Sequence, residues 1–234
     1  MSPDFCLALL LDGPLQSWGN TSRFDRRTTA LHPTRSGILG LIAAAMGIDK
    51  YAPDEAEQLR RLNLLRVTTL TLVRRDQRGE SLPIRRLEDY HTVTGIRRAS
   101  GKVDEDATVQ TYRHYLLDAR FGVLVEGPAA LLEEIASALR DPKWGLWFGR
   151  KSCLPASPVL AAGPGEHSAV WTELLRRAGL PATLKQEEFD RVIEVSPAET
   201  GAERLDDAPV AYGAPIGNRH APRWIKTVRR SVHS

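Results

Sequence analysis

Regular hydrophobic periodicity marks six segments in the first 163 residues, and their order limits the folds that this chain can adopt. Strand-like segments are short, apolar and rich in β-branched residues, whereas the two helical segments have apolar residues at helical spacing. In chain order the segments are a strand at 5–12, a helix at about 34–48, strands at 65–75 and 119–127, a helix at 128–141 and a short strand around 157–163. A short surface helix at 54–63 is also predicted.

The order strand, helix, strand, strand, helix, strand is that of the ferredoxin-like split βαβ arrangement, which RNA-recognition domains also use. We therefore expect an α+β fold. The periodicity disappears for about forty residues between the second and third strands. Structureless loops of this length are uncommon in compact domains and are usually functional. We therefore interpret residues 76–117 as a greatly enlarged hairpin with a functional role.

The chain is less regular from residue 163 onward. A helix pattern at 168–179 is followed by an acidic, strand-like stretch at 188–196 and by a segment rich in proline and glycine. The sequence thus predicts two units: residues 1–162, which include the enlarged hairpin, and a small β-containing C-terminal subdomain at 163–234.

The composition is that of an ordinary globular protein, with 42% hydrophobic and 26% charged residues among 234. Cys6 and Cys153 are far apart, which excludes a disulfide framework and favours a reducing cytoplasm. The N-terminus carries no basic leader, and no apolar run approaches the ~20 residues needed to span a bilayer. P-loop, GxGxxG and HExxH patterns are absent. We expect a cytoplasmic protein without metal, cofactor or membrane partner.

The charges are segregated along the chain, although the net charge is only +3. Basic residues dominate at 17–40, where Arg23 and Arg27 lie, and at 74–102 and 219–234. Acidic residues dominate at 187–207, with eight against two basic residues, and we expect this stretch to face solvent. Such polarity favours a protein with one side that binds a polyanion.

The start of the first long helix is a candidate anion site. Thr34 or Ser36 can cap the helix, but Arg35 is unfavourable beside the positive end of the helix dipole unless an anion is bound there. A solvated arginine next to an ordinary cap explains the same residues equally well, so both interpretations stay open at this point.

Paired arginines and aromatic rings alternate in the enlarged hairpin, a mixture suited to the phosphates and bases of single-stranded nucleic acid. The alternative is that Tyr90 and Tyr112 pack the hairpin's own small core. A second cluster places Arg150 and Lys151 after Gly149, which lets a backbone or phosphate approach closely. Trp144 and Trp147, near this cluster, are expected to pack in the core.

Catalysis is the remaining chemical alternative. His91 or His114, with a tyrosine partner, has the acid–base chemistry for metal-independent cleavage of RNA through its 2′-hydroxyl. Nothing in the spacing requires this, because a histidine in a hairpin is more often a hydrogen-bonding or stacking group.

Five motifs together resemble the Cas-five family of the RAMP superfamily, whose members belong to CRISPR Cascade complexes such as type I-E. The resemblance runs from about residue 5 to residue 159. The motifs are, in order, "LLLDGPLQSWG", "HPTRSGILGLIAAAMGI", "EDYHTV", "VQTYRHYLLDARF" and "FGRKSCLPASPV".

The resemblance implies a non-catalytic RNA-binding subunit used in antiviral defence, with a ferredoxin-like palm and a thumb formed by the long hairpin. Such a subunit caps the Cascade backbone and binds the 5′ handle of crRNA. It contacts the backbone subunit and the large subunit, and it reaches target DNA only through the complex. Another branch of the family cleaves CRISPR repeat RNA itself, which keeps the endoribonuclease alternative open.

The same resemblance implies RNA-binding roles for two groups of residues, the start of the first long helix with the loop before it and the thumb, and it implies no catalytic or metal-binding residue. Arg35 would form a phosphate seat with Thr34 and Ser36, while the thumb would fix the kinked strand. The full set of expected RNA-binding residues is Gln16, Ser17, Trp18, Arg23, Arg27, Thr34, Arg35, Ser36, Tyr90, His91, Arg97, Gln110, Arg113, Gly149, Arg150 and Lys151.

Overall fold

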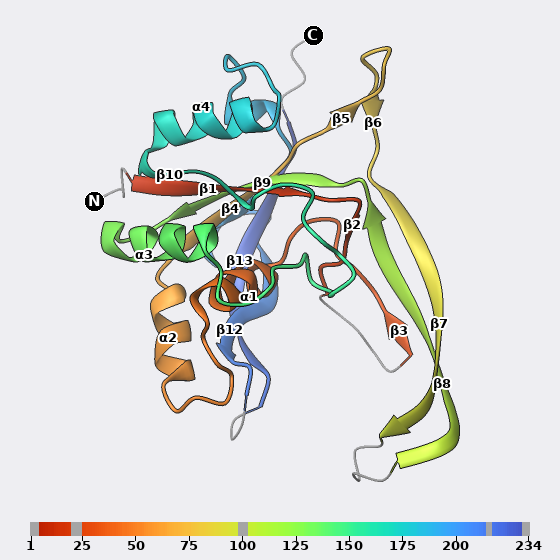
Figure 1. Ribbon diagram of the computed structural model, residues 1–234. Coiled ribbons are helices and arrows are strands. Elements are labelled where there is room, and N and C mark those ends of the chain that lie inside the picture. The colour runs from red at the N-terminus through yellow and green to blue at the C-terminus, as the bar shows by residue number, and fades with distance from the viewer. Residues whose placement is uncertain (1–4, 20–24, 98–102, 214–216, 231–234) are drawn as a thin grey trace.

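The computed structural model describes residues 5–19, 25–97, 103–213 and 217–230, with only the backbone of 96–97 and 103–107. A seven-stranded sheet forms its centre, in the order β10-β1-β9-β4-β11-β13-β12 (Figure 1). No helix in these described ranges is long and apolar enough to cross a membrane.

Six elements follow the strand and helix order that the sequence predicts. They are β1 (Phe5–Asp12), α1 (Arg35–Met46), β4 (Arg66–Thr71), β9 (Arg120–Glu126), α3 (Ala129–Arg140) and β10 (Leu160–Glu166). The four strands lie in the order β10-β1-β9-β4, and each neighbouring pair is antiparallel. The predicted surface helix is α2 (Glu55–Leu62).

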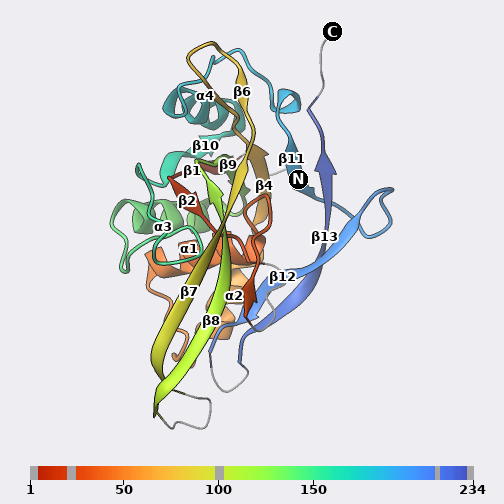
Figure 2. The same cartoon turned by 90° about the vertical axis from the view of Figure 1, so that its right-hand side faces the viewer.

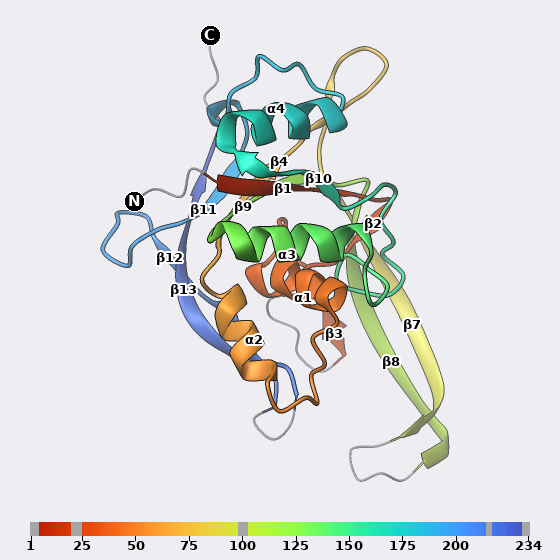
Figure 3. The same cartoon turned by 60° about the vertical axis from the view of Figure 1, so that its left-hand side comes forward.

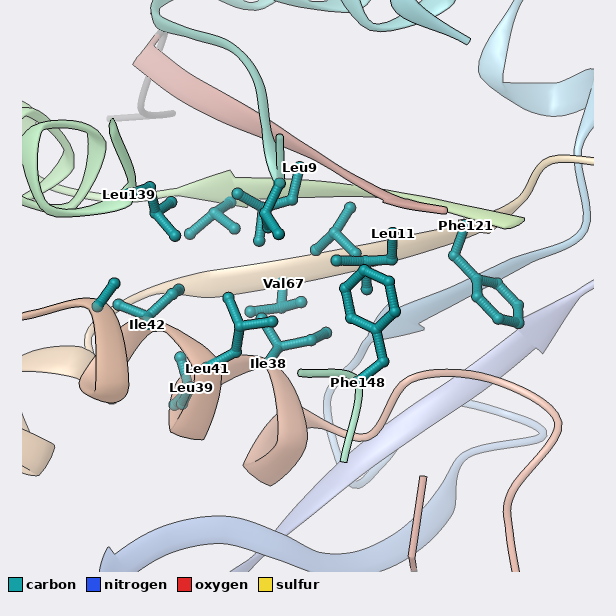
Figure 4. Packing of buried hydrophobic residues seen from close by; sticks show 14 of the residues in the cluster. Leu9, Leu11, Ile38, Leu39, Leu41, Ile42, Val67, Phe121, Leu139 and Phe148 are labelled. Carbon is teal, nitrogen blue, oxygen red and sulfur yellow. The ribbon is translucent and has the colours of Figure 1, made fainter. Parts of the chain in front are cut away.

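Helices cover both faces of this sheet. In β1, Leu7, Leu9 and Leu11 belong to the core beneath α1 and α3, which Figure 4 shows from close by. The alternate residues of β1 belong to a second core beneath α4 (His167–Arg177), on the opposite face in Figure 3. Strand side chains alternate between faces, so a strand buried on both sides needs a continuous apolar run. The sequence "CLALLL" satisfies this requirement.

The enlarged hairpin is regular rather than structureless. β7 (Arg85–Arg97) and β8 (Val103–Leu117) pair antiparallel and project away from the central sheet (Figure 2). The base of β8 also pairs with two short strands, β2 (Leu15–Gln16) and β3 (Arg26–Arg27). Residues before β7 form a separate small hairpin of β5 (Arg74–Arg75) and β6 (Ser81–Leu82). The insertion is thus two hairpins, of which the second, at 85–117, is the long hairpin.

The C-terminal segment is not a separate unit, which corrects the predicted division at residue 163. That boundary falls inside β10, which pairs with β1. β11 (Arg191–Glu194) then pairs with β4, and β13 (Arg219–Val228) and β12 (Glu203–Ala211) extend the same sheet. A one-turn 3₁₀ helix, η1 (Gln186–Glu188), precedes β11. Shared hydrogen bonding across the boundary makes 1–162 and 163–234 parts of one structure.

Candidate functional site

A cleft of about 350 Å³ opens beside the N-terminus of α1. Three chain segments that carry expected site residues, and that the sequence separates widely, meet there: the stretch from the loop after β2 to β3, the start of α1 and the loop that follows α3. Seven of the sixteen expected site residues line the cleft, namely Ser17, Trp18, Arg27, Thr34, Ser36, Gly149 and Arg150. None of the lining residues that the structure describes is acidic.

Gly149 allows the first and last of these segments to touch. Its φ of 91° lies in the left-handed region, and a Cβ atom there would lie 1.8 Å from the carbonyl oxygen of Ser17. The amide of Ser17 in turn donates to the carbonyl of Phe148 over 3.0 Å. Gly149 thus allows the close approach expected from the sequence, and the group that approaches it is the backbone of Ser17.

Arg150 stabilises the cleft wall at the base of the long hairpin. Its guanidinium donates to the carbonyls of His114 and Arg27 over 3.1 and 2.9 Å and lies 4.6 Å from the centroid of the Tyr115 ring. Arg27 itself is exposed, and it pairs in register with Arg113 across β3 and β8. Residues paired in register point to the same face of a sheet, so Arg27, which lines the cleft, and Arg113 next to it form a cationic strip.

Arg35 does not form the predicted phosphate seat. Its residue is only 4% exposed, and its guanidinium pairs with Glu194 and donates to the carbonyls of Asn63 and Leu65 over 3.1 and 2.8 Å. Its backbone amide donates to Asp207 over 2.9 Å. A buried cation whose donors are used by the protein cannot bind RNA, so this prediction is wrong. Thr34 does cap the helix, because its hydroxyl accepts from the amide of Gly37.

Gln16 and Trp18 are also structural, contrary to expectation. The fully buried amide of Gln16 donates to the carbonyls of Leu11 and Ala119 and accepts from the Trp18 indole over 3.0 Å. Trp18 is 1% exposed and packs beside Phe148, with ring centroids 6.0 Å apart. Trp18 therefore lines the cleft with very little exposed surface. These two side chains organise the wall and do not offer a binding surface.

The long hairpin divides its predicted site residues between two faces. Tyr90 and Gln110 lie on one face, while His91 and Arg113 lie on the other, as the β7–β8 register requires. Tyr90 and its partner Tyr112 contact each other with centroids 5.4 Å apart, which fits the small core considered from the sequence, but Tyr90 remains half exposed. The two faces of the long hairpin thus present different side chains.

The two histidines have separate carboxylate partners. His91 lies 2.5 Å from Asp89, and His114 lies 2.6 Å from Glu88 on the opposite face. They therefore cannot serve one phosphodiester as an acid and base pair.

Three further expected residues have different positions. Arg23 lies outside the described residues, and only the backbone of Arg97 is described, within β7. Lys151 is exposed, with its ammonium 5.6 Å from the centroid of the Trp147 ring. The expected core packing of Trp144 is wrong, since this side chain is 42% exposed. Phe148 takes the buried position instead.

The sequence interpretation missed a fourth segment that lines the cleft, formed by Tyr212, Asn218 and His220 from the C-terminal strands and their connection. The Tyr212 hydroxyl donates to the carbonyl of Ser36 over 3.0 Å, which holds it against α1. Burial, followed by the charges of Glu55 and Asp207, raises the pKa of Tyr212, so it stays a neutral donor. Burial also lowers the pKa of His220. The only sequence signal for this part of the cleft was the presence of a tyrosine and a histidine in a stretch rich in Gly and Pro.

Comparisons with known proteins agree with this architecture. A family model described as CRISPR-associated protein (Cas_Cas5) matches residues 6–230. The match covers nearly the whole chain, so this is a CRISPR-associated protein. The chain belongs to the Cas5 family.

Individual relatives show the same relationship. The chain is 34% identical over 156 residues to the CRISPR system Cascade subunit CasD of Escherichia coli (strain K12), covering 65% of this chain and 68% of that protein. A chain of a CRISPR RNA-guided surveillance complex is 29% identical, with a TM-score of 0.71 over 97% of this chain and 90% of that one. A structure described as a Cas protein is 28% identical, with a TM-score of 0.60 over 96% and 95%.

Proposed function

We propose that this chain is a non-catalytic Cascade subunit that binds and caps the 5′ handle of crRNA. The observation that carries the proposal is the cleft at the start of α1, which has cations on one wall and no acidic lining residue among those described. Family membership and the likeness to CasD support it. Arginine suits this role because its planar guanidinium contacts phosphates in a bidentate manner.

In this proposal the central sheet acts as a ferredoxin-like palm and the long hairpin acts as the thumb. The covered sheet faces favour RNA binding at the loops and the hairpin, not on a bare sheet as in RNA-recognition domains. The thumb and neighbouring surfaces would contact the backbone subunit and the large subunit, and target DNA would be reached through the assembled complex. The role in antiviral defence follows from that of the complex.

Arg27 and Arg113 give the direct test of RNA binding, because both belong to the cationic strip and neither contributes to the core. Each change to alanine should weaken binding of crRNA and reduce the slope of log affinity against log salt by about one unit. Arg60→Ala on α2 is the matched control, since Arg60 is exposed and its ion pair among the described residues is with neighbouring Glu57. Slopes that match the wild type in both strip variants would contradict the proposal.

The non-catalytic part has a separate test. Purified protein incubated with end-labelled CRISPR repeat RNA in EDTA should retain the RNA without cutting it. A discrete cut that disappears on His91→Ala or His114→Ala would establish the endoribonuclease alternative instead.

A further inference from the structure

The small hairpin of β5 and β6 is a second cationic projection, separate from the long hairpin. It extends on the α4 side of the central sheet, whereas the long hairpin points the opposite way (Figures 1 and 2). Residues 74–86 contain five arginines against two acidic residues, and they contain no aromatic ring. None of the described residues that line the cleft at the start of α1 belongs to this segment. The proposed function therefore does not explain its charge.

Asp118, in the turn between β8 and β9, fixes the base of the small hairpin from both sides. Its carbonyl accepts from Arg74 Nε over 2.7 Å, and its carboxylate accepts from Arg85 over 3.1 Å. Arg74 also pairs with Asp12 at the end of β1. Asp118 has a φ of 51°, in the left-handed region that aspartate tolerates better than most side chains. Two of the five arginines thus hold the small hairpin in one direction.

Asp76 closes the turn at the tip of the small hairpin. One oxygen of its carboxylate accepts from the amides of Arg78 and Glu80, over 2.8 and 2.9 Å. Its own amide donates to the carbonyl of Glu80 over 2.9 Å. Gly79 has a φ of 82°, which this turn requires, and its carbonyl accepts from Arg75 over 2.7 Å. The turn is therefore preorganised, with Arg78 at its tip.

The other three arginines are exposed and have no carboxylate partner among the described residues. They are Arg75, Arg78 and Arg86. Glu80 is the only acidic side chain of the segment that does not close the turn. Guanidinium groups on a preorganised projection suit a polyanion, because binding then orders little of the chain.

We propose that the small hairpin binds the phosphate backbone of double-stranded DNA that lies against the assembled complex. The inference goes beyond the proposed function, in which target DNA is reached through the complex as a whole. Contacts from arginine to phosphates bind duplex DNA without regard to its sequence and position the protein on it. A two-stranded ribbon also has the width that the major groove admits.

A duplex fits this projection better than a single strand or an acidic protein does. Sites for single strands stack bases on aromatic rings, and residues 74–86 have none. Protein interfaces bury a cluster of apolar side chains at their centre, whereas Leu82 is the only exposed large hydrophobic residue described in this segment. The stacked bases of a duplex leave phosphates as its main accessible charge, and cations alone can bind them.

Binding of the assembled complex to a short duplex DNA with no match to the guide measures this contact. Arg78→Ala should weaken binding and reduce the slope of log affinity against log salt by about one unit, and the combined change of Arg75 and Arg78 to alanine by about two units. Arg60→Ala is the matched control, because Arg60 is an exposed arginine on α2, outside the projection. Slopes equal to that of the wild type in both arginine variants would overturn the proposal.

The turn gives a test that charge alone does not satisfy. Asp76→Ala removes a negative charge but opens the turn, so it should weaken binding of the duplex. Asp76→Asn removes the same charge and keeps an oxygen acceptor for the two amides, so it should bind at least as well as the wild type. Equal affinities of the two variants would refute the preorganised tip.

Further measurements on the same complexes separate this inference from the proposed function. Arg78→Ala should retain guide RNA, the other Cascade subunits and single-stranded DNA complementary to the guide as the wild type does. Loss of guide RNA or of a subunit would refute the duplex contact and assign the hairpin to that partner. If Arg27→Ala weakens RNA binding but Arg78→Ala leaves duplex binding unchanged, only the present inference fails. If neither Arg27→Ala nor Arg113→Ala affects RNA binding, the proposed function fails instead.

Discussion

Arg35 is the type of residue expected in an anion-binding site, but its surroundings are those of the protein interior. It belongs to a four-charge cluster with Glu194, Arg223 and Asp207, in which two cations balance two carboxylates. Arg223 contacts Asp207 through two nitrogens, at 2.5 and 2.9 Å, and lies 3.5 Å from Glu194. The cluster joins the start of α1 to β11, β12 and β13, so it connects the two ends of the chain.

Arg35→Ala should lower the free energy of unfolding by about 3–5 kcal/mol, because it removes the closer cation from Glu194 and leaves Arg223 alone against two carboxylates. Urea unfolding measures this, with Arg60→Ala as the exposed control, for which we expect a change within about 0.5 kcal/mol. A loss for Arg35→Ala no larger than that of the control would show that the cluster is not a structural element.

The same cluster predicts a dependence of stability on pH. Burial alone would raise the pKa of Asp207, but hydrogen bonds and charge from Arg223 and Arg35 outweigh it and lower the pKa. A carboxyl with a lowered folded-state pKa stabilises the fold above its unfolded pKa of about 3.9, and this contribution is lost as pH falls further. The stability difference between wild type and Asp207→Asn should therefore shrink below about pH 4. Urea titrations at several pH values check this, and a constant difference would contradict it.

At the scale of elements, the long hairpin is anchored at its base and free along its length. Tyr115 and Leu116 are buried in the core, and the Tyr112 amide donates to the Asp25 carbonyl over 2.8 Å. Farther out, Tyr90, Val93 and Val109 are exposed on a two-stranded ribbon. Such a ribbon is marginally stable alone, which favours a role completed by RNA or a partner subunit.

Replacing residues 92–110 with Asn-Gly should preserve the fold and abolish assembly on crRNA. The shortened strands end at the paired residues His91 and Thr111, which a two-residue turn can join. The Tm should change little because the buried base remains, whereas co-purification with crRNA and other Cascade subunits should be lost. Normal assembly of this variant would contradict the thumb role.

Elements with clear periodicity were predictable from the sequence, and so was their order. β1, α1 and α3 follow local patterns that burial imposes. Long-range pairing was not predictable: nothing near Arg35 indicates Glu194, which lies 159 residues away. For the same reason the acidic stretch was expected to face solvent, although Glu194 and Asp207 pair with buried arginines. Tyr212 and His220 reach the cleft only through the sheet extension, which local patterning does not reveal.

At the scale of the whole molecule, β10 to β13 and α4 complete the sheet and both cores. A chain ending at residue 162 would lose most of β10, expose the apolar residues beneath α4 and leave Arg35 without its carboxylate. We expect this truncation to lack a cooperative thermal transition in circular dichroism, with the full chain as the control. A folded, cooperative fragment would restore the two-unit division.

Under the proposed function, the helix α4 also limits how proteins of this design can change their RNA preference. Because it closes the sheet face that RNA-recognition domains leave open, new specificity has to arise in the connecting loops and the projecting ribbon. Exchange of those segments between relatives has to keep the core residues that they carry, such as Trp18, Phe148 and Tyr115. Chimaeras carrying the loops of one homologue on the sheet of another should therefore take the guide preference of the loop donor.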